Sequence, residues 1–259
     1  MFAQVLCSEF LKLRRSKVPL FTLAGLSLGP LGISLFMWII REPGRAKQLG
    51  LLGTKAQLSG LEATWPAFAS MLPLIVGIGG MLLLSFIVAY LFGREYEDGT
   101  AKNMLGLPVP RAWFVYAKLA VALVWWIALV AFVLAESALV GLALGLPGFS
   151  AQILATAIGG SLLAAGISYL LAPVIALVTI WGRGTMAPLG FALGMMALGN
   201  LLGHTGWSAW FPWSIVPSLI GMVSSPAVLP VGSYVVVALT FGAGVAGSVW
   251  LIRTADNTQ

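Results

Sequence analysis

The sequence predicts an all-α membrane protein with six transmembrane helices, and two observations carry this prediction. Of its 259 residues, 59% are hydrophobic and only 8% are charged, with a mean hydropathy of +0.99. A soluble domain carries about 25% charged residues. The chain also contains long uncharged runs, each near the ~20 apolar residues that cross a bilayer. Soluble enzyme folds are therefore excluded, and the lone Cys7 excludes a disulfide framework or a multi-cysteine metal site.

Residues 1–17 are expected to form an amphipathic helix lying in the membrane interface. Their apolar side chains share one helical face, and the polar ones fall opposite. The apolar set is Phe2, Val5, Leu6, Phe10 and Leu13; the polar set includes Gln4, Ser8, Lys12 and Arg15.

Six spans are predicted after this helix. They cover residues 18–40, 66–93, 113–145, 151–181, 185–203 and 228–252. The apolar stretch 207–227 carries Pro212, Pro217 and Pro226, and proline breaks helices. We expect it to dip into the outer leaflet as a proline-rich re-entrant segment. A seventh span, which would put the C-terminus outside, is the alternative.

The placement of lysine and arginine predicts that both chain ends, including the tail 253–259, are cytoplasmic, because cytoplasmic loops are enriched in these residues. In this orientation the cytoplasmic side holds ten bases and the outside holds four. The inner set is Lys12, Arg14, Arg15, Lys17, Arg94, Lys102, Arg111, Lys118, Arg183 and Arg253; the outer set is Arg41, Arg45, Lys47 and Lys55. The net charge of +6 is therefore assigned to membrane topology and not to nucleic-acid binding.

Catalytic and nucleotide sites are not predicted. Gly242, Gly244 and Gly247 match a dinucleotide-binding spacing, but they lie inside a predicted span. Small residues that let a neighbouring helix approach closely are the preferred interpretation. His204 has no nearby cysteine or acid with which to form a metal site or a catalytic triad.

The informative polar segment is the loop 94–112, which we expect to be a short exposed helix broken at Gly99 and followed by a turn at Pro108 and Pro110. A rigid loop of mixed charge suits docking of a partner protein, although an ordinary solvated loop is the alternative. The candidate docking residues are Arg94, Glu95, Glu97, Asp98, Gly99, Thr100, Lys102, Pro108 and Arg111.

Two motifs resemble the type-2 ABC exporter permeases, with the bacitracin-resistance and lantibiotic-immunity permeases as the nearest branch. The first is the loop pattern Glu95, Gly99, Thr100, Leu105, Pro108, Arg111 and Lys118. The second is the N-terminal pattern Glu9, Lys12, Leu13, Arg14, Arg15 and Ser16. Six spans and an outer proline-rich dip before the last span extend the resemblance over nearly the whole chain.

The resemblance implies a permease subunit in a bacterial cytoplasmic membrane, which is a transporter component and not an enzyme. Two permease copies would pair as a homodimer, and two separate ATP-binding subunits would dock beneath them. Those subunits would bind ATP and Mg, while this chain would hold no cofactor. The loop 94–112 would include the cytoplasmic coupling helix that transmits the motion of the ATPase to the spans.

Four further residues are candidates for a substrate path. Glu136 is the only acid inside a span, where an unpaired carboxylate is costly. Trp207, Trp210 and Trp213 fit an interfacial aromatic belt, and the resemblance also places them near an outer exit.

The leading hypothesis is ATP-driven export of an amphiphilic molecule such as an antimicrobial peptide, a drug or a lipid-like compound. A secondary carrier would call for internal repeats and more ionisable groups in the membrane. A membrane protein that senses its ligand or sequesters it for immunity is the other alternative.

Overall fold

The structure is a computed structural model that describes residues 1–50, 62–101, 103, 106, 108–223 and 229–254. The described part is helical and contains no strand. Six helical segments are long and apolar enough to cross a membrane, which confirms the predicted fold class. They are α2 (Val18–Arg41), the compound segment Trp65–Glu97, α8 (Ala112–Ala143), α9 (Ala151–Gly182), α10 (Met186–Gly203) and α12 (Val231–Thr254).

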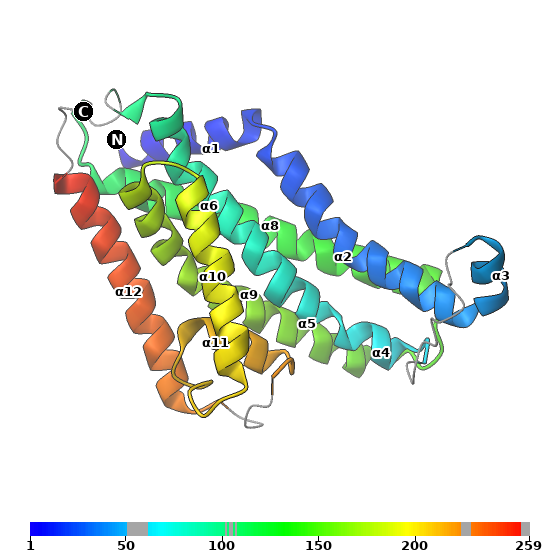
Figure 1. The fold of residues 1–259 in the computed structure, drawn as a ribbon. Helices are drawn as coiled ribbons and strands as arrows, with labels where there is room; N and C mark the ends of the chain where they lie inside the picture. Colours follow the sequence, from blue (N-terminus) through cyan, green and yellow to red (C-terminus); the bar gives the residue numbers. More distant parts are fainter. Residues whose placement is uncertain (51–61, 102, 104–105, 107, 224–228, 255–259) are drawn as a thin grey trace.

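Helix α1 (Phe2–Arg15) lies across the end of the bundle at which α12 also ends (Figure 1). It packs against α8 through a buried stripe of Val5, Glu9 and Leu13. Phe2 and Phe10, expected on the apolar face, remain 38% and 43% exposed. The stripe that faces the protein therefore contains an acid, and part of the predicted apolar face is exposed.

The second span is irregular in the half farther from α1. It consists of α4 (Trp65–Ser70), α5 (Leu72–Leu74), the π-helix η1 (Ile75–Gly80) and α6 (Met81–Glu97). Pro66 and Pro73 stand at the starts of α4 and α5, and π-helical turns occur frequently at functional sites. Gly80 lies against the indole of Trp126, which leaves no room for a side chain at this position. Trp126 in turn donates a hydrogen bond to the carbonyl of Ala165 at 3.0 Å, so the irregular span is tied to α8 and α9.

Helix α9 is the central helix of the bundle and packs against α6, α10 and α12. Its contact with α12 explains two of the three glycines in the motif of the last span, whereas a Cβ at Gly242 would meet nothing within 4 Å, contrary to the prediction. A Cβ atom at Gly244 would lie 2.7 Å from the backbone nitrogen of Val174, and one at Gly247 would lie 3.0 Å from Leu177. Close approach of two helices, as predicted, accounts for these two glycines.

The segment between α10 and α12 contains α11 (Pro212–Leu219), whose eight residues are too few to cross a bilayer. Helix α10 ends and α12 begins at the same end of the bundle, with α11 beside them (Figure 1). The Ser233 hydroxyl donates a hydrogen bond to the carbonyl of Ala209 at 2.7 Å and holds this connection to α12. The depth to which α11 enters the membrane stays a prediction.

Candidate functional site

Four charged side chains from three helices form a buried cluster at the α1 end of the bundle. Lys118 comes from α8, Glu95 from α6, and Glu9 and Lys12 from α1. The Lys118 ammonium lies 2.7 Å from Oε2 of Glu95 and 3.0 Å from Oε2 of Glu9. It also donates a hydrogen bond to the carbonyl of Leu91, one turn before Glu95. The side chains of Lys118, Glu95 and Glu9 are only 2%, 6% and 1% exposed.

Lys12, whose side chain is half-buried, is the fourth member of the cluster. Its ammonium lies 2.5 Å from Oε1 of Glu9 and 3.1 Å from Oε1 of Glu95. Burial lowers the pKa of Lys12, but the two carboxylates outweigh it, so the pKa is raised and the side chain stays charged. Two acids and two bases therefore balance, and each acid bridges both lysines.

The geometry of these helices explains why the cluster can form. On α1, Glu9 and Lys12 are three residues apart and share a face. On α6, the carbonyl of Leu91 and the side chain of Glu95 stand one turn apart and point at the same ammonium. Removing one member of such a buried group costs about 3–5 kcal/mol, because the remaining charge is left uncompensated. The cluster therefore fixes α1, α6 and α8 to one another.

The position of Glu95 corrects the expectation of an exposed helix starting at Arg94. Helix α6 continues without interruption through Glu97, so residues 94–97 are its last turn. The chain turns away from the helix at Gly99, directly after the C-cap Asp98, with a φ of +67° that suits glycine. The Thr100 amide donates to the carbonyl of Glu95 at 2.9 Å. Glu95 is drawn inside because Lys118 and Lys12 supply its counter-charges. It cannot offer its carboxylate to a partner surface.

Arg94 and Asp98 form the more exposed side of this last turn. Their side chains are 34% and 55% exposed, and Nε of Arg94 lies 3.3 Å from Oδ2 of Asp98. Nη1 of Arg94 also donates to the carbonyl of Lys12 at 3.4 Å, which links α6 to α1 a second time. A solvent-exposed ion pair of this kind contributes at most about 1 kcal/mol.

Two further predicted residues connect to other helix ends. Oε1 of Glu97 accepts hydrogen bonds from the amide and the hydroxyl of Thr185, at 2.9 and 2.5 Å, in the turn between α9 and α10. Arg111 donates to the carbonyls of Ile252 and Arg253, at 3.4 and 3.3 Å, in the last turn of α12. The structure thus connects this segment to α1, α8, α12 and the α9–α10 turn.

The remaining predicted residues of this region are either exposed or outside the part of the chain that the structure describes. Thr100 and Pro108 are exposed, as are Arg14 and Arg15 on α1. Lys102 and Leu105 of the predicted loop lie outside the described residues. Sequence reasoning assigned Lys118 only as a downstream match to the loop pattern and missed its buried ion pairs. It also missed Thr185.

Comparison with known proteins agrees with this arrangement. The family model described as "ABC-2 family transporter protein" matches residues 5–199. The chain belongs to the ABC-2 transporter family. It is 30% identical over 187 residues to the bacitracin transport permease protein BCRB of Bacillus licheniformis, an alignment covering 70% of this chain and 88% of that protein. No solved structure matches it significantly. The chain is therefore a membrane subunit of an ABC transporter, and the family implies an ATP-binding partner.

The four substrate-path candidates of this ABC-2 permease are not brought into one site. Trp213 is 6% exposed and packs against Phe191 and Phe211, whereas Trp207 and Trp210 are 69% and 55% exposed. These aromatics belong to the region of α10, α11 and α12. Glu136 lies instead on α8, which packs chiefly against α1 and α2. Its Oε2 atom is buried and has no hydrogen-bond partner among the described residues.

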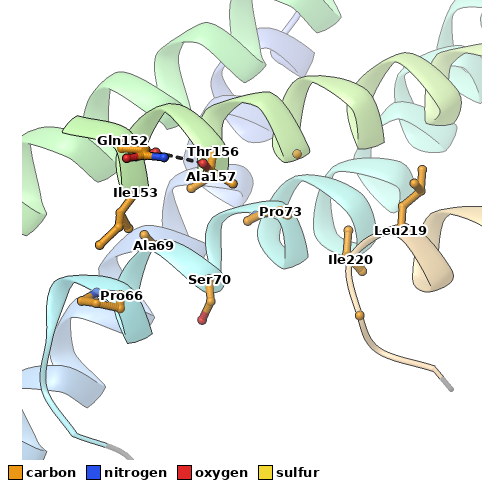
Figure 2. Close-up of a pocket in the computed structure, with 12 residues that line it drawn as sticks. Pro66, Ala69, Ser70, Pro73, Gln152, Ile153, Thr156, Ala157, Leu219 and Ile220 are labelled. Atoms are coloured by element: carbon orange, nitrogen blue, oxygen red, sulfur yellow. Dashed lines mark hydrogen bonds between the residues drawn. The ribbon is translucent and has the colours of Figure 1, made fainter. Parts of the chain in front are cut away.

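A cavity of about 620 Å³ opens between the irregular second span, α9 and α11 of the permease. Figure 2 shows Pro66, Ser70 and Pro73 on one wall, Gln152 and Thr156 on another, and Leu219 and Ile220 at the side. The Thr156 hydroxyl donates to the backbone carbonyl of Gln152 at 2.9 Å. The lining is mostly apolar, with a few uncharged polar groups, and it contains none of the four predicted path residues.

Proposed function

We propose that this chain is the permease subunit of an ATP-driven exporter of an amphiphilic compound, with the α1 end of the bundle in the cytoplasm. The observation that carries the proposal is the buried cluster of Glu9, Lys12, Glu95 and Lys118. It joins the last turn of α6, which holds the first residues of the predicted coupling segment 94–112, to α1 and α8. A push on this segment would therefore be passed to several helices at once.

The distribution of charge supports the orientation. Bases of α1, of the last turn of α6, of the α9–α10 turn and of the end of α12 occupy the same end of the bundle, which is the end that the positive-inside rule assigns to the cytoplasm. Arg41, in contrast, is at the far end of α2 and donates to the carbonyls of Leu144 and Gly145 at 2.5 and 3.3 Å. Both chain ends would then be cytoplasmic.

In the proposed complex, two copies of the permease pair as a homodimer, and one ATP-binding subunit docks beneath each copy. ATP and Mg are held by those subunits. When they close, the segment 94–112 moves with them, and the ties from Glu95, Glu97 and Arg111 carry the displacement into the bundle. Discrete rearrangements of packed helices are the usual result of such a push.

The substrate class is proposed as amphiphilic compounds, including antimicrobial peptides, drugs and lipid-like molecules. The printed name of the Bacillus licheniformis relative, a bacitracin transport permease, makes bacitracin the first compound to test. The mostly apolar cavity beside α4 and α5 suits a compound with an apolar body and few polar groups.

The test is reconstitution of the permease with an ATP-binding subunit encoded beside its gene. We expect the two proteins to co-purify, bacitracin to stimulate ATP hydrolysis in proteoliposomes, and labelled compound to move away from the side that holds the ATPase. The variant Glu95→Ala should weaken this stimulation, and Lys17→Ala, an exposed charge outside the cluster, is its matched control. Binding of bacitracin without movement would instead identify a sequestering immunity protein.

A further inference from the structure

A second, smaller cavity lies between α1 and α6, directly beside the buried cluster. Its volume is about 440 Å³. Lys12, Arg15 and Arg94 line it together with the side chain of Tyr90, and none of its lining residues is acidic. Leu11, also in the lining, is 42% exposed, so the cavity has an apolar edge.

The free hydrogen-bonding capacity of the cavity is that of donors. The two serine hydroxyls in its lining are used, since Ser8 donates to the carbonyl of Val5 and Ser16 donates to that of Leu13, at 2.8 and 2.7 Å. Lys12 is already bonded to Glu9 and Glu95, and Nη1 of Arg94 donates to the hydroxyl of Tyr90 and to the carbonyl of Lys12, both at 3.4 Å. The guanidinium of Arg15, the Nη2 group of Arg94 and the hydroxyl proton of Tyr90 remain as donors. One arginine guanidinium can donate two parallel hydrogen bonds to two oxygens of the same phosphate.

The acids nearby pair with Lys12 and Arg94 but leave the charge of Arg15 uncompensated. Glu9 and Glu95 are buried behind it and shared with Lys118, and Glu97 is bound to Thr185. Asp98 pairs with Arg94 at 3.3 Å on an exposed edge. Arg15 is exposed and has no acidic partner among the described residues. The mouth of the cavity is therefore positive.

We infer that this cavity binds the headgroup of an anionic phospholipid, with the phosphate held by Arg15, Arg94 and the hydroxyl of Tyr90. The inference rests on α1 lying at the membrane surface and is independent of the transported compound and its direction. An anionic lipid needs cations for its headgroup and an apolar surface for the start of its acyl chains. The three basic side chains and the exposed Leu11 supply both.

Occupancy of this site has a consequence for the buried cluster. Lys12 lines the cavity and also bridges Glu9 and Glu95. A phosphate in the cavity would share Lys12 with the two carboxylates and would hold α1 against α6 from the membrane side. The lipid would thus brace the same pair of helices that the cluster joins.

The test is native mass spectrometry of the detergent-purified permease supplied with phosphatidylglycerol or with phosphatidylcholine. Because detergent removes the charged membrane surface, adducts report bound lipid and not general attraction. We expect phosphatidylglycerol to be retained in preference to phosphatidylcholine. Arg15→Gln should weaken retention at least about fivefold, the factor that corresponds to ~1 kcal/mol per basic residue. Arg15→Lys should restore part of it.

The matched control is Lys17→Gln, which removes a charge that is also exposed, two residues away but outside the cavity. An equal loss in both variants would mean diffuse attraction and would overturn the inference. So would equal retention of the two lipids, or displacement of phosphatidylglycerol by millimolar inorganic phosphate, which would indicate a site for free phosphate. Unchanged adducts in Arg15→Gln with lost co-purification of the ATP-binding subunit would mean that the cavity contacts that protein instead.

Discussion

Lys118 and Glu95 form an ion pair with an Nζ–Oε2 distance of 2.7 Å, buried between the first turns of α8 and the last turn of α6. Glu95 lies at the start of the predicted coupling segment 94–112, and Lys118 lies just beyond its end. The base of that segment is therefore closed by a direct charge contact, and α1 is added to it through Glu9. Because this ion pair joins α6 to α8, we expect displacement of the segment to move both helices together.

The first prediction concerns the loss of this ion pair. Lys118→Met keeps the length of the side chain but leaves Glu95 and Glu9 with only the half-exposed Lys12. We expect a destabilisation of about 3–5 kcal/mol, seen as a lower Tm of the purified protein. Adding Glu95→Gln to the same chain should recover part of the loss, because one uncompensated charge is then removed. Lys17→Met is the control, and an equally small change in Tm for both single variants would contradict a stabilising cluster.

The second prediction concerns the end of α6 at Gly99. Its φ of +67° strains any residue with a Cβ, and nothing lies within 4 Å of the position a Cβ would take. Gly99→Val therefore introduces backbone strain of about 1–2 kcal/mol without a clash. We expect this variant to insert into the membrane but to lose substrate-stimulated ATP hydrolysis, because the segment leaves α6 in a different direction. Gly99→Asn tolerates this conformation and should keep the stimulation. Normal stimulation in the valine variant would argue against a coupling role.

The six spans could be predicted because the membrane imposes a simple local rule on them. A run such as Ala151–Gly182 is uncharged along its whole length, and the structure gives a helix with these same limits. The break of the second span into α4, α5 and η1 was not predicted, although Pro73 and the glycines of η1 were visible signals. Their effect depends on neighbours such as Trp126, which the sequence does not place.

The candidate site was predicted only in part, because its ion pairs join distant segments. The loop pattern identified Glu95, and the N-terminal pattern identified Glu9 and Lys12. No local pattern says that these residues meet at Lys118. Two signals were nevertheless available: Glu9 stands one turn from both Val5 and Leu13 on the face that becomes buried, and Lys118 lies seven residues beyond Arg111, already within the apolar helix.

The third prediction concerns topology. A reporter fused after Gln259 should show a cytoplasmic location, and one inserted within residues 47–55 should show an external location. The physical reason is that α11 is too short to span, so six crossings return the chain to its starting side. Fusions at residues 100 and 184 provide internal standards for the cytoplasmic side. An external signal after Gln259 would mean that 207–227 crosses the membrane.

The last prediction concerns Glu136. A purely structural role would require a hydrogen bond from its carboxylate to a neighbouring helix, and then Glu136→Ala would express poorly. The structure disfavours this role, because Oε2 is buried without a partner among the described residues. Replacing a polar group that has no partner breaks no hydrogen bond. We therefore expect both Glu136→Ala and Glu136→Gln to reach the membrane at normal levels and to keep the free energy of unfolding within about 1 kcal/mol of the wild type. Keeping an unpaired carboxylate in an apolar helix costs free energy, which points to a functional use of its charge. Both variants should therefore lose substrate stimulation of the partner ATPase.

The control is Ser137→Ala, next to Glu136. The Ser137 hydroxyl is bonded only to the carbonyl of Val133 within its own helix. Full stimulation in both Glu136 variants would show that the acid is only tolerated, and a destabilised alanine variant beside a normal glutamine variant would restore the structural explanation.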